Sequence, residues 1–221
     1  MKQQKHKSSP HKLTPKNILI SILIIALWWV FWLGSQALFI IDVPFISDWI
    51  AASDDQSTCI RVTIWIVAVH LIALGVWHWF QRDYSFLKIK DKWDILAYAV
   101  PIVLAIVLLA TVPTAFGVTM WVYIIVMIIT NFAQDLLTTG YMQTGLSKTL
   151  GPIGAAIITC VVFYLGHFMI VDTLTIGGSI MVVGFILFSW LRYKRGNIYF
   201  VNAIHLTWAL ATILISPTLP L

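Results

Sequence analysis

Side chains that can carry out acid–base chemistry occur inside long apolar stretches of this sequence. Asp135, His167 and His205 each lie in a separate apolar stretch. Asn131 lies four residues before Asp135, and residues at this spacing share one face of a helix. Asn202 lies three residues before His205 and shares a face with it in the same way. Because ionisable side chains within a membrane usually face protein or a water-filled cavity, these two polar pairs are predicted to converge on one site.

A carboxylate and two imidazoles on separate helices can transfer protons, bind zinc or iron, or form interhelical hydrogen bonds. No two histidines within the apolar stretches have the His-x-x-x-His spacing of common metal motifs. His70 and His78 are eight residues apart, about 12 Å along a helix, so they cannot share one metal ion. We interpret His70 as a packing residue and His78 as a membrane-interface residue, and we expect no metal and no other cofactor.

Three short motifs contain the polar residues, in this order: Gln134-Asp135-Leu-Leu-Thr-Thr139-Gly140-Tyr141, Phe163-Tyr-Leu-Gly-His167 and His205-Leu-Thr-Trp-Ala209. This order resembles the CAAX protease and bacteriocin-processing family of intramembrane proteases, also called the Abi family. That family includes prenyl-protein endopeptidases and bacterial immunity proteins. Its first motif is a pair of glutamates and then an arginine, its second is Phe-x-x-x-His, and its third is His-x-x-x-Asn. The resemblance extends roughly from Val118 to Trp208 and implies a metal-independent peptidase.

The resemblance also implies a role for each motif position. The first glutamate and the second-motif histidine activate water, and the third-motif histidine and asparagine stabilise the oxyanion. Here the base position is Gln134, whose amide cannot take up a proton. The arginine position is Thr139, and the oxyanion asparagine position is Ala209. By this resemblance the catalytic positions are Gln134, Asp135, His167 and His205, and the site-shaping positions are Asn131, Thr139, Phe163, Asn202 and Ala209.

Three functions remain open at this point. The first is a family member with weakened or lost proteolysis that binds a membrane-associated peptide or protein, in bacteriocin self-immunity or in regulation of the cell envelope. The second is an active endopeptidase that uses Asp135 as its base together with His167 and His205. The third is an unrelated small transporter, which the absence of an inverted repeat in the sequence disfavours.

Composition indicates a protein whose solvent is the lipid bilayer. Of the 221 residues, 60% are hydrophobic and only 10% are charged. The mean hydropathy is +0.90. A soluble domain normally has about 25% charged residues, so this chain has too little polar surface to face water on all sides. Its basic residues gather on one side of the predicted membrane spans, which explains the positive net charge, and we therefore expect no nucleic-acid partner.

Charged residues divide the sequence into apolar intervals that predict an all-α bundle of about seven transmembrane helices. The 40-residue interval after Asp94 is long enough for two helices and should break at Thr111–Gly117, where Pro113 and Gly117 disfavour a helix. The predicted spans lie in these intervals: 17–41, 61–82, 94–113, 118–135, 148–172, 172–192 and 196–221. We expect a basic tail at 1–16, three N-terminal helices within 17–113 and a four-helix core within 118–221.

The distribution of charge predicts a cytoplasmic N-terminus. With seven spans, every lysine and arginine except Arg61 falls on one side of the membrane, which the positive-inside rule assigns to the cytoplasm. The protein is therefore expected to be a multi-pass plasma-membrane protein, and the resemblance implies a bacterial one. These intervals also predict that Asp135 and His205 lie about 10 Å from the inner edge of their spans and that His167 lies nearer 20 Å.

Overall fold

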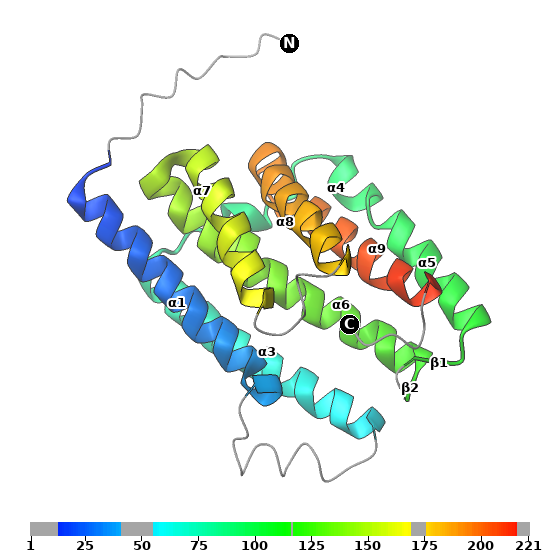
Figure 1. Ribbon diagram of the computed structural model, residues 1–221. Helices are drawn as coiled ribbons and strands as arrows, with labels where there is room; N and C mark the ends of the chain where they lie inside the picture. Colours follow the sequence, from blue (N-terminus) through cyan, green and yellow to red (C-terminus); the bar gives the residue numbers. More distant parts are fainter. Residues whose placement is uncertain (1–12, 41–54, 116, 169–175, 216–221) are drawn as a thin grey trace.

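Helices account for nearly all of the computed structural model, which describes residues 13–40, 55–115, 117–168 and 176–215 (Figure 1). An α-helix satisfies its backbone polar groups internally, which is the requirement that lipid imposes on a spanning segment. Within these residues the fold is therefore all-α apart from one hairpin of two-residue strands, and large apolar side chains are exposed on its helices.

The helices are, in chain order, α1 (Pro15–Ile40), α3 (Asp55–Phe80), α4 (Lys92–Leu96), α5 (Ala99–Thr111), α6 (Met120–Asp135), α7 (Gln143–Phe168), α8 (Ile176–Arg195) and α9 (Tyr199–Ile215). The shorter elements are the 3₁₀ turn η1 (Ser85–Leu87), the antiparallel strands β1 (Thr114–Ala115) and β2 (Val118–Thr119), and the π-helical segment η2 (Leu136–Met142). The predicted helix break at Thr111–Gly117 is confirmed, because α5 ends at Thr111 and the hairpin follows.

Among the residues that the structure describes, four helical segments are long and apolar enough to cross a membrane, namely Pro15–Ser35, Asp55–Phe80, Lys92–Thr111 and Met120–His167. A shorter apolar helix covers Tyr199–Leu214. The last of the four long segments contains both the fourth and the fifth predicted spans. The sixth predicted span begins at Asp172, which lies outside the described residues.

A reversal inside α7 brings the second motif back to the level of the first. Gly151 has φ 77° and ψ 165°, a conformation that favours glycine, and Pro152 then starts the returning helix (Figure 1). Asp135 lies sixteen residues before Gly151 and His167 lies sixteen residues after it, a distance of about 24 Å along the helix in each case. The expected difference in depth between Asp135 and His167 is therefore wrong, because the fourth helix continues past Lys148 before it reverses.

Two clusters of buried side chains hold the helices together. One joins α1, α3, η1, η2, α7, α8 and α9, and its largest fully buried side chains are Trp28, Trp32, Phe86 and Phe163. The other joins α5, α6 and α9 around Leu108 and Leu210. The segment from α6 to the start of α7 contributes to both clusters, so the polar residues of α6 are held on a helix that is packed on two sides.

Candidate functional site

Asp135 is the centre of a buried hydrogen-bond network between α6 and α9. Its side chain is fully buried at the end of α6. Asn202 Nδ2 donates to Asp135 Oδ2 at 2.9 Å, and His205 Nδ1 lies 3.1 Å from Asp135 Oδ1. The predicted convergence of the α6 and α9 polar residues is thus confirmed for these three side chains. Both carboxylate oxygens of Asp135 are engaged within the protein.

This arrangement fixes the orientation and tautomer of His205. With the Asp135 carboxylate as acceptor, the proton of the imidazole lies on Nδ1, and Nε2 presents a lone pair. The side chain of His205 is 13% exposed while that of Asp135 is 0% exposed. The ring of His205 also packs against Phe188 of α8, with centroids 4.9 Å apart. Nε2 of His205 is therefore the atom of this pair that can exchange a proton with a bound molecule.

Tyr98 extends the network to the turn between α4 and α5. Its hydroxyl donates to Asn202 Oδ1 at 2.7 Å, so the amide of Asn202 is held at both ends. Sequence reasoning did not identify Tyr98, because it lies outside all three motifs and no spacing connects it with Asn202. A polar residue at the start of an apolar helix is the only available signal, and it is a weak one.

His167 approaches the same region from α7 and is enclosed by aromatic rings. Its Nδ1 donates to the carbonyl of Phe163 at 2.9 Å, which leaves the Nε2 lone pair available. The ring lies 4.6 Å from Phe163, 4.7 Å from Phe185 and 5.0 Å from Trp32, measured between centroids. Phe185 and Phe188, three residues apart on α8, thus each hold one of the two imidazoles.

Two polar residues of α6 do not join this network. Gln134 is partly buried and forms no side-chain hydrogen bond with any other described residue. Asn131 is buried, and its Nδ2 has no hydrogen-bond partner among the described residues. His70 of α3 donates from Nδ1 to its own helix, at the carbonyl of Ile66, in agreement with its interpretation as a packing residue. His78 is hydrogen-bonded to Tyr84 at 2.9 Å.

An arginine from another helix reaches the position at which the first motif lacks one. Arg192 of α8 is buried, and its Nε donates to the backbone carbonyl of Thr139 at 2.9 Å. Its Nη2 donates to Thr144 Oγ1 at 2.8 Å. Sequence reasoning treated Arg192 only as a cytoplasmic topology signal, because nothing in the local sequence separates a buried arginine at a helix end from a solvated one. Thr139 itself donates to the carbonyl of Asp135 at 2.9 Å.

The oxyanion position offers no donor. Ala209 is buried on α9, four residues after His205 and on the same face of the helix. A methyl side chain cannot donate a hydrogen bond to a reacting carbonyl. For metal ions, no group of three His, Cys, Asp or Glu side chains within the described ranges has the arrangement of a binding site.

A known protein family matches the segment that contains these residues. The model of the type II CAAX prenyl endopeptidase Rce1-like family matches residues 116–211, which include all three motifs. Residues 116–211, less than half of the chain, are similar to the Rce1-like family. No curated protein and no solved structure matches the chain significantly. The Rce1-like segment runs from the β1–β2 hairpin into α9, and it contains Asp135, His167 and His205 together with the reversal at Gly151.

Proposed function

We propose that this Rce1-like protein binds a membrane-associated peptide or protein at the Asp135–His205 site and that its peptide hydrolysis is weakened or lost. The observation that carries the proposal is that, among the described residues, no free carboxylate lies at this site. Gln134 stands at the base position, and both oxygens of Asp135 accept hydrogen bonds from Asn202 and His205. An amide cannot accept a proton from water at neutral pH, and hydrogen bonds within the protein already engage both oxygens of the Asp135 carboxylate.

The expected loss of rate is large. Removing a general base typically costs about 100- to 10,000-fold, and removing one oxyanion donor costs about 100- to 1,000-fold. Gln134 and Ala209 correspond to these two losses. Arg192, which hydrogen-bonds Thr139, can supply a positive charge near the arginine position, but it supplies neither a base nor an oxyanion donor.

The same geometry is suited to binding an extended peptide. Nε2 of His205 on α9 and Nε2 of His167 on α7 are two hydrogen-bond acceptors that backbone N–H groups can reach, and both helices pack against α8. Aromatic rings around His167 provide apolar surface for a lipid-facing side chain. Bacteriocin self-immunity and regulation of a cell-envelope enzyme are roles in which such binding, without cleavage, is sufficient.

The topology belongs to the same proposal. We place seven spans in the chain, with the N-terminus in the cytoplasm of a bacterial cell and with residues 1–16, 17–113 and 118–221 as basic tail, N-terminal helices and core. The distribution of lysine and arginine supports this assignment, since only Arg61 falls on the outer side.

A second candidate is an active endopeptidase in which His205 acts as the base. The 3.1 Å contact between Asp135 Oδ1 and His205 Nδ1 favours it, because a buried carboxylate that orients an imidazole is a common way to activate the opposite ring nitrogen. In this version Asp135 is a positioning residue rather than the base.

Restoration of the missing base distinguishes the two candidates. The full chain is reconstituted in liposomes and incubated with a farnesylated CAAX peptide as a defined probe. We expect no cleavage by the wild type above the His205→Ala background, and cleavage that is raised roughly 100-fold or more in Gln134→Glu combined with Ala209→Asn. Gln134→Ala is the matched control and should remain inactive. If the wild type and Gln134→Ala cleave equally and His205→Ala does not, the second candidate is correct and proteolysis is retained.

A further inference from the structure

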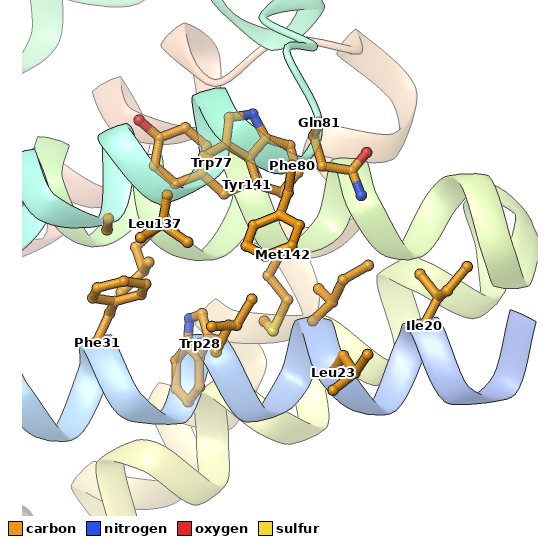
Figure 2. A pocket seen from close by; sticks show the side chains of 14 residues that line it. Ile20, Leu23, Trp28, Phe31, Trp77, Phe80, Gln81, Leu137, Tyr141 and Met142 are labelled. Carbon is orange, nitrogen blue, oxygen red and sulfur yellow. The ribbon is translucent and has the colours of Figure 1, made fainter.

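An apolar cavity of about 430 Å³ lies between α1 and α3, and side chains of η2 also line it (Figure 2). Trp28 and Phe31 of α1 and Trp77 of α3 line it, as do Tyr141 and Met142 of η2. It is separate from the polar site. Leu137 faces the cavity while Asp135, two residues earlier, faces α9, and residues at this spacing lie on opposite sides of a helix.

The dimensions of the cavity match one leaflet of a bilayer. Its wall on α1 extends from Ile20 to Phe31, which is about 16 Å along the helix axis. The hydrocarbon core of a bilayer is about 30 Å thick, so the cavity covers about half of that depth. The end near Ile20 is the one closest to the start of α1 and to the end of α3 at Phe80. A single lipid chain that enters at this end would extend to about the middle of the membrane.

The polar end of the cavity carries an excess of positive charge. Gln81, the polar residue at this end, accepts a hydrogen bond from Lys148 Nζ at 3.1 Å. Lys148 also pairs with Asp83 at 2.9 Å, and its side chain remains 45% exposed. Arg82 is exposed beside Gln81, and the exposed Lys16 lies four residues before Ile20 on the same helix face.

The single carboxylate at the polar end of the cavity does not neutralise the basic side chains there. Asp83 is paired with Lys148, while the two further basic side chains at this end, Lys16 and Arg82, are exposed. Asp91 and Asp94, the next acidic residues along the chain, are both paired with Arg195. An apolar cavity one leaflet deep, with a net positive charge at its aqueous end, is complementary to an anionic phospholipid. The cavity matches the acyl chain, and the positive charge matches the headgroup.

We propose that this cavity is a binding site for an anionic phospholipid of the adjacent leaflet, with one acyl chain between α1 and α3 and its phosphate near Lys148 and Arg82. The site is also connected with the polar network. Trp28 lines the cavity, donates to Thr138 Oγ1 at 3.1 Å and stacks on Trp32, which contacts His167. A bound acyl chain therefore packs against Trp28 and stabilises the Trp28–Trp32 stack that contacts His167, whether or not the protein cleaves peptides.

Retention of defined lipids by the purified full chain tests this proposal. The protein in detergent is mixed with equal amounts of phosphatidylglycerol and phosphatidylcholine that carry the same acyl chains, and bound lipid is measured by native mass spectrometry. We expect the wild type to retain phosphatidylglycerol over phosphatidylcholine by about tenfold, since each basic residue near a membrane surface attracts an anionic headgroup by a few fold. Arg82→Gln combined with Lys148→Gln should remove this preference, and Lys148→Arg alone should preserve it.

Two further variants separate the cavity from general surface charge. Val76→Phe fills part of the cavity and should lower retention of both lipids, while Lys88→Gln removes an exposed cation elsewhere on the same side and should change nothing. Equal retention of the two headgroups by the wild type would overturn the proposal. So would a preference that survives the loss of Arg82 and Lys148. Retention of a farnesylated peptide that depends on Val76, without retention of phosphatidylglycerol, would make the cavity a peptide subsite instead.

Discussion

At the scale of single residues, the contrast between Asp135 and Asn131 shows which polar groups α6 uses. Both are buried and lie four residues apart on one face. Asp135 satisfies two donors on α9, whereas Asn131 leaves its own Nδ2 unpaired within the described structure. Replacing Asp135 with an apolar residue would therefore create unsatisfied buried donors, whereas replacing Asn131 would remove one.

We predict that Asp135→Ala destabilises the protein and that Asn131→Ala does not. Asp135→Ala leaves Asn202 Nδ2 and His205 Nδ1 without their acceptor, at a cost of about 1–3 kcal/mol. Asn131→Ala removes a donor that is already unpaired. Thermal unfolding in detergent, followed by size-exclusion chromatography of the heated samples, measures both. Equal loss of stability in the two variants would contradict the network described here.

A pH-dependent contribution is expected from Asp83, outside the membrane spans. Burial opposes its ionisation, but hydrogen bonds from Lys148 and from the backbone N–H of Ser85 outweigh this effect and lower the pKa of Asp83 to about 2. Because the folded-state pKa lies below the ordinary value of 3.8, the stabilisation is present above about pH 4 and is lost as the pH falls towards 2. The difference in unfolding temperature between wild type and Asp83→Asn should follow this profile. A difference that is constant from pH 2 to pH 7 would show that Asp83 is not paired.

At the scale of elements, the approach of α1 to α7 depends on the absence of a side chain at Gly166. A Cβ atom there would lie 2.7 Å from the Trp28 ring and 2.8 Å from Trp32 Nε1. Trp32 Nε1 also donates to the carbonyl of Gly166 at 3.2 Å. The two tryptophans in turn form the wall between the cavity and His167.

Gly166→Ala is predicted to displace this wall. Overpacking of a core by one methyl group costs about 1–3 kcal/mol, and the fluorescence of Trp28 and Trp32 should change as their rings move. Gly75→Ala is the matched control, because nothing lies within 4 Å of the Cβ position in that helix, and its stability should stay equal or rise. A Gly166→Ala protein as stable as the Gly75→Ala protein would contradict the close approach of α1 and α7.

The sequence predicted the meeting of Asp135 with Asn202 and His205, because helical spacing places each polar pair on one face. It did not predict where the fourth helix ends. Lys148 was interpreted as a charged boundary, but the helix continues to the turn at Gly151, and this shift changes the depth of every residue after it. Burial of Arg192 was also missed, because charge patterns indicate a side of the membrane and not the contacts of one side chain.

The aromatic residues show the same limit of sequence reasoning. The position of Trp77 near the end of an apolar stretch is typical of a tryptophan at the membrane interface. The structure buries it against Tyr141, and its Nε1 donates to the carbonyl of Asp83 at 3.1 Å. Hydropathy gives the depth of a residue in the membrane but not which neighbouring helix covers it.

At the scale of the whole molecule, the proposed topology makes opposite ends of the bundle accessible from opposite sides. In a chain without Cys59 and Cys160, Lys88→Cys should react with a membrane-impermeant maleimide only after cells are permeabilised. Thr114→Cys, in the exposed β1 strand, should react in intact cells. The reverse pattern of labelling would contradict a cytoplasmic N-terminus with seven spans.

The central claim is that this protein acts without cleaving peptides. Comparison of the protein termini in membranes from wild-type, deletion and His205→Ala strains, with expression of the variant confirmed, tests it without knowledge of the partner. We predict that no terminus depends on the protein or on His205, although the deletion strain has lost the protein's function. Specific cleavage products that disappear in both the deletion and the His205→Ala strain would contradict the claim and would identify the substrate of an active peptidase.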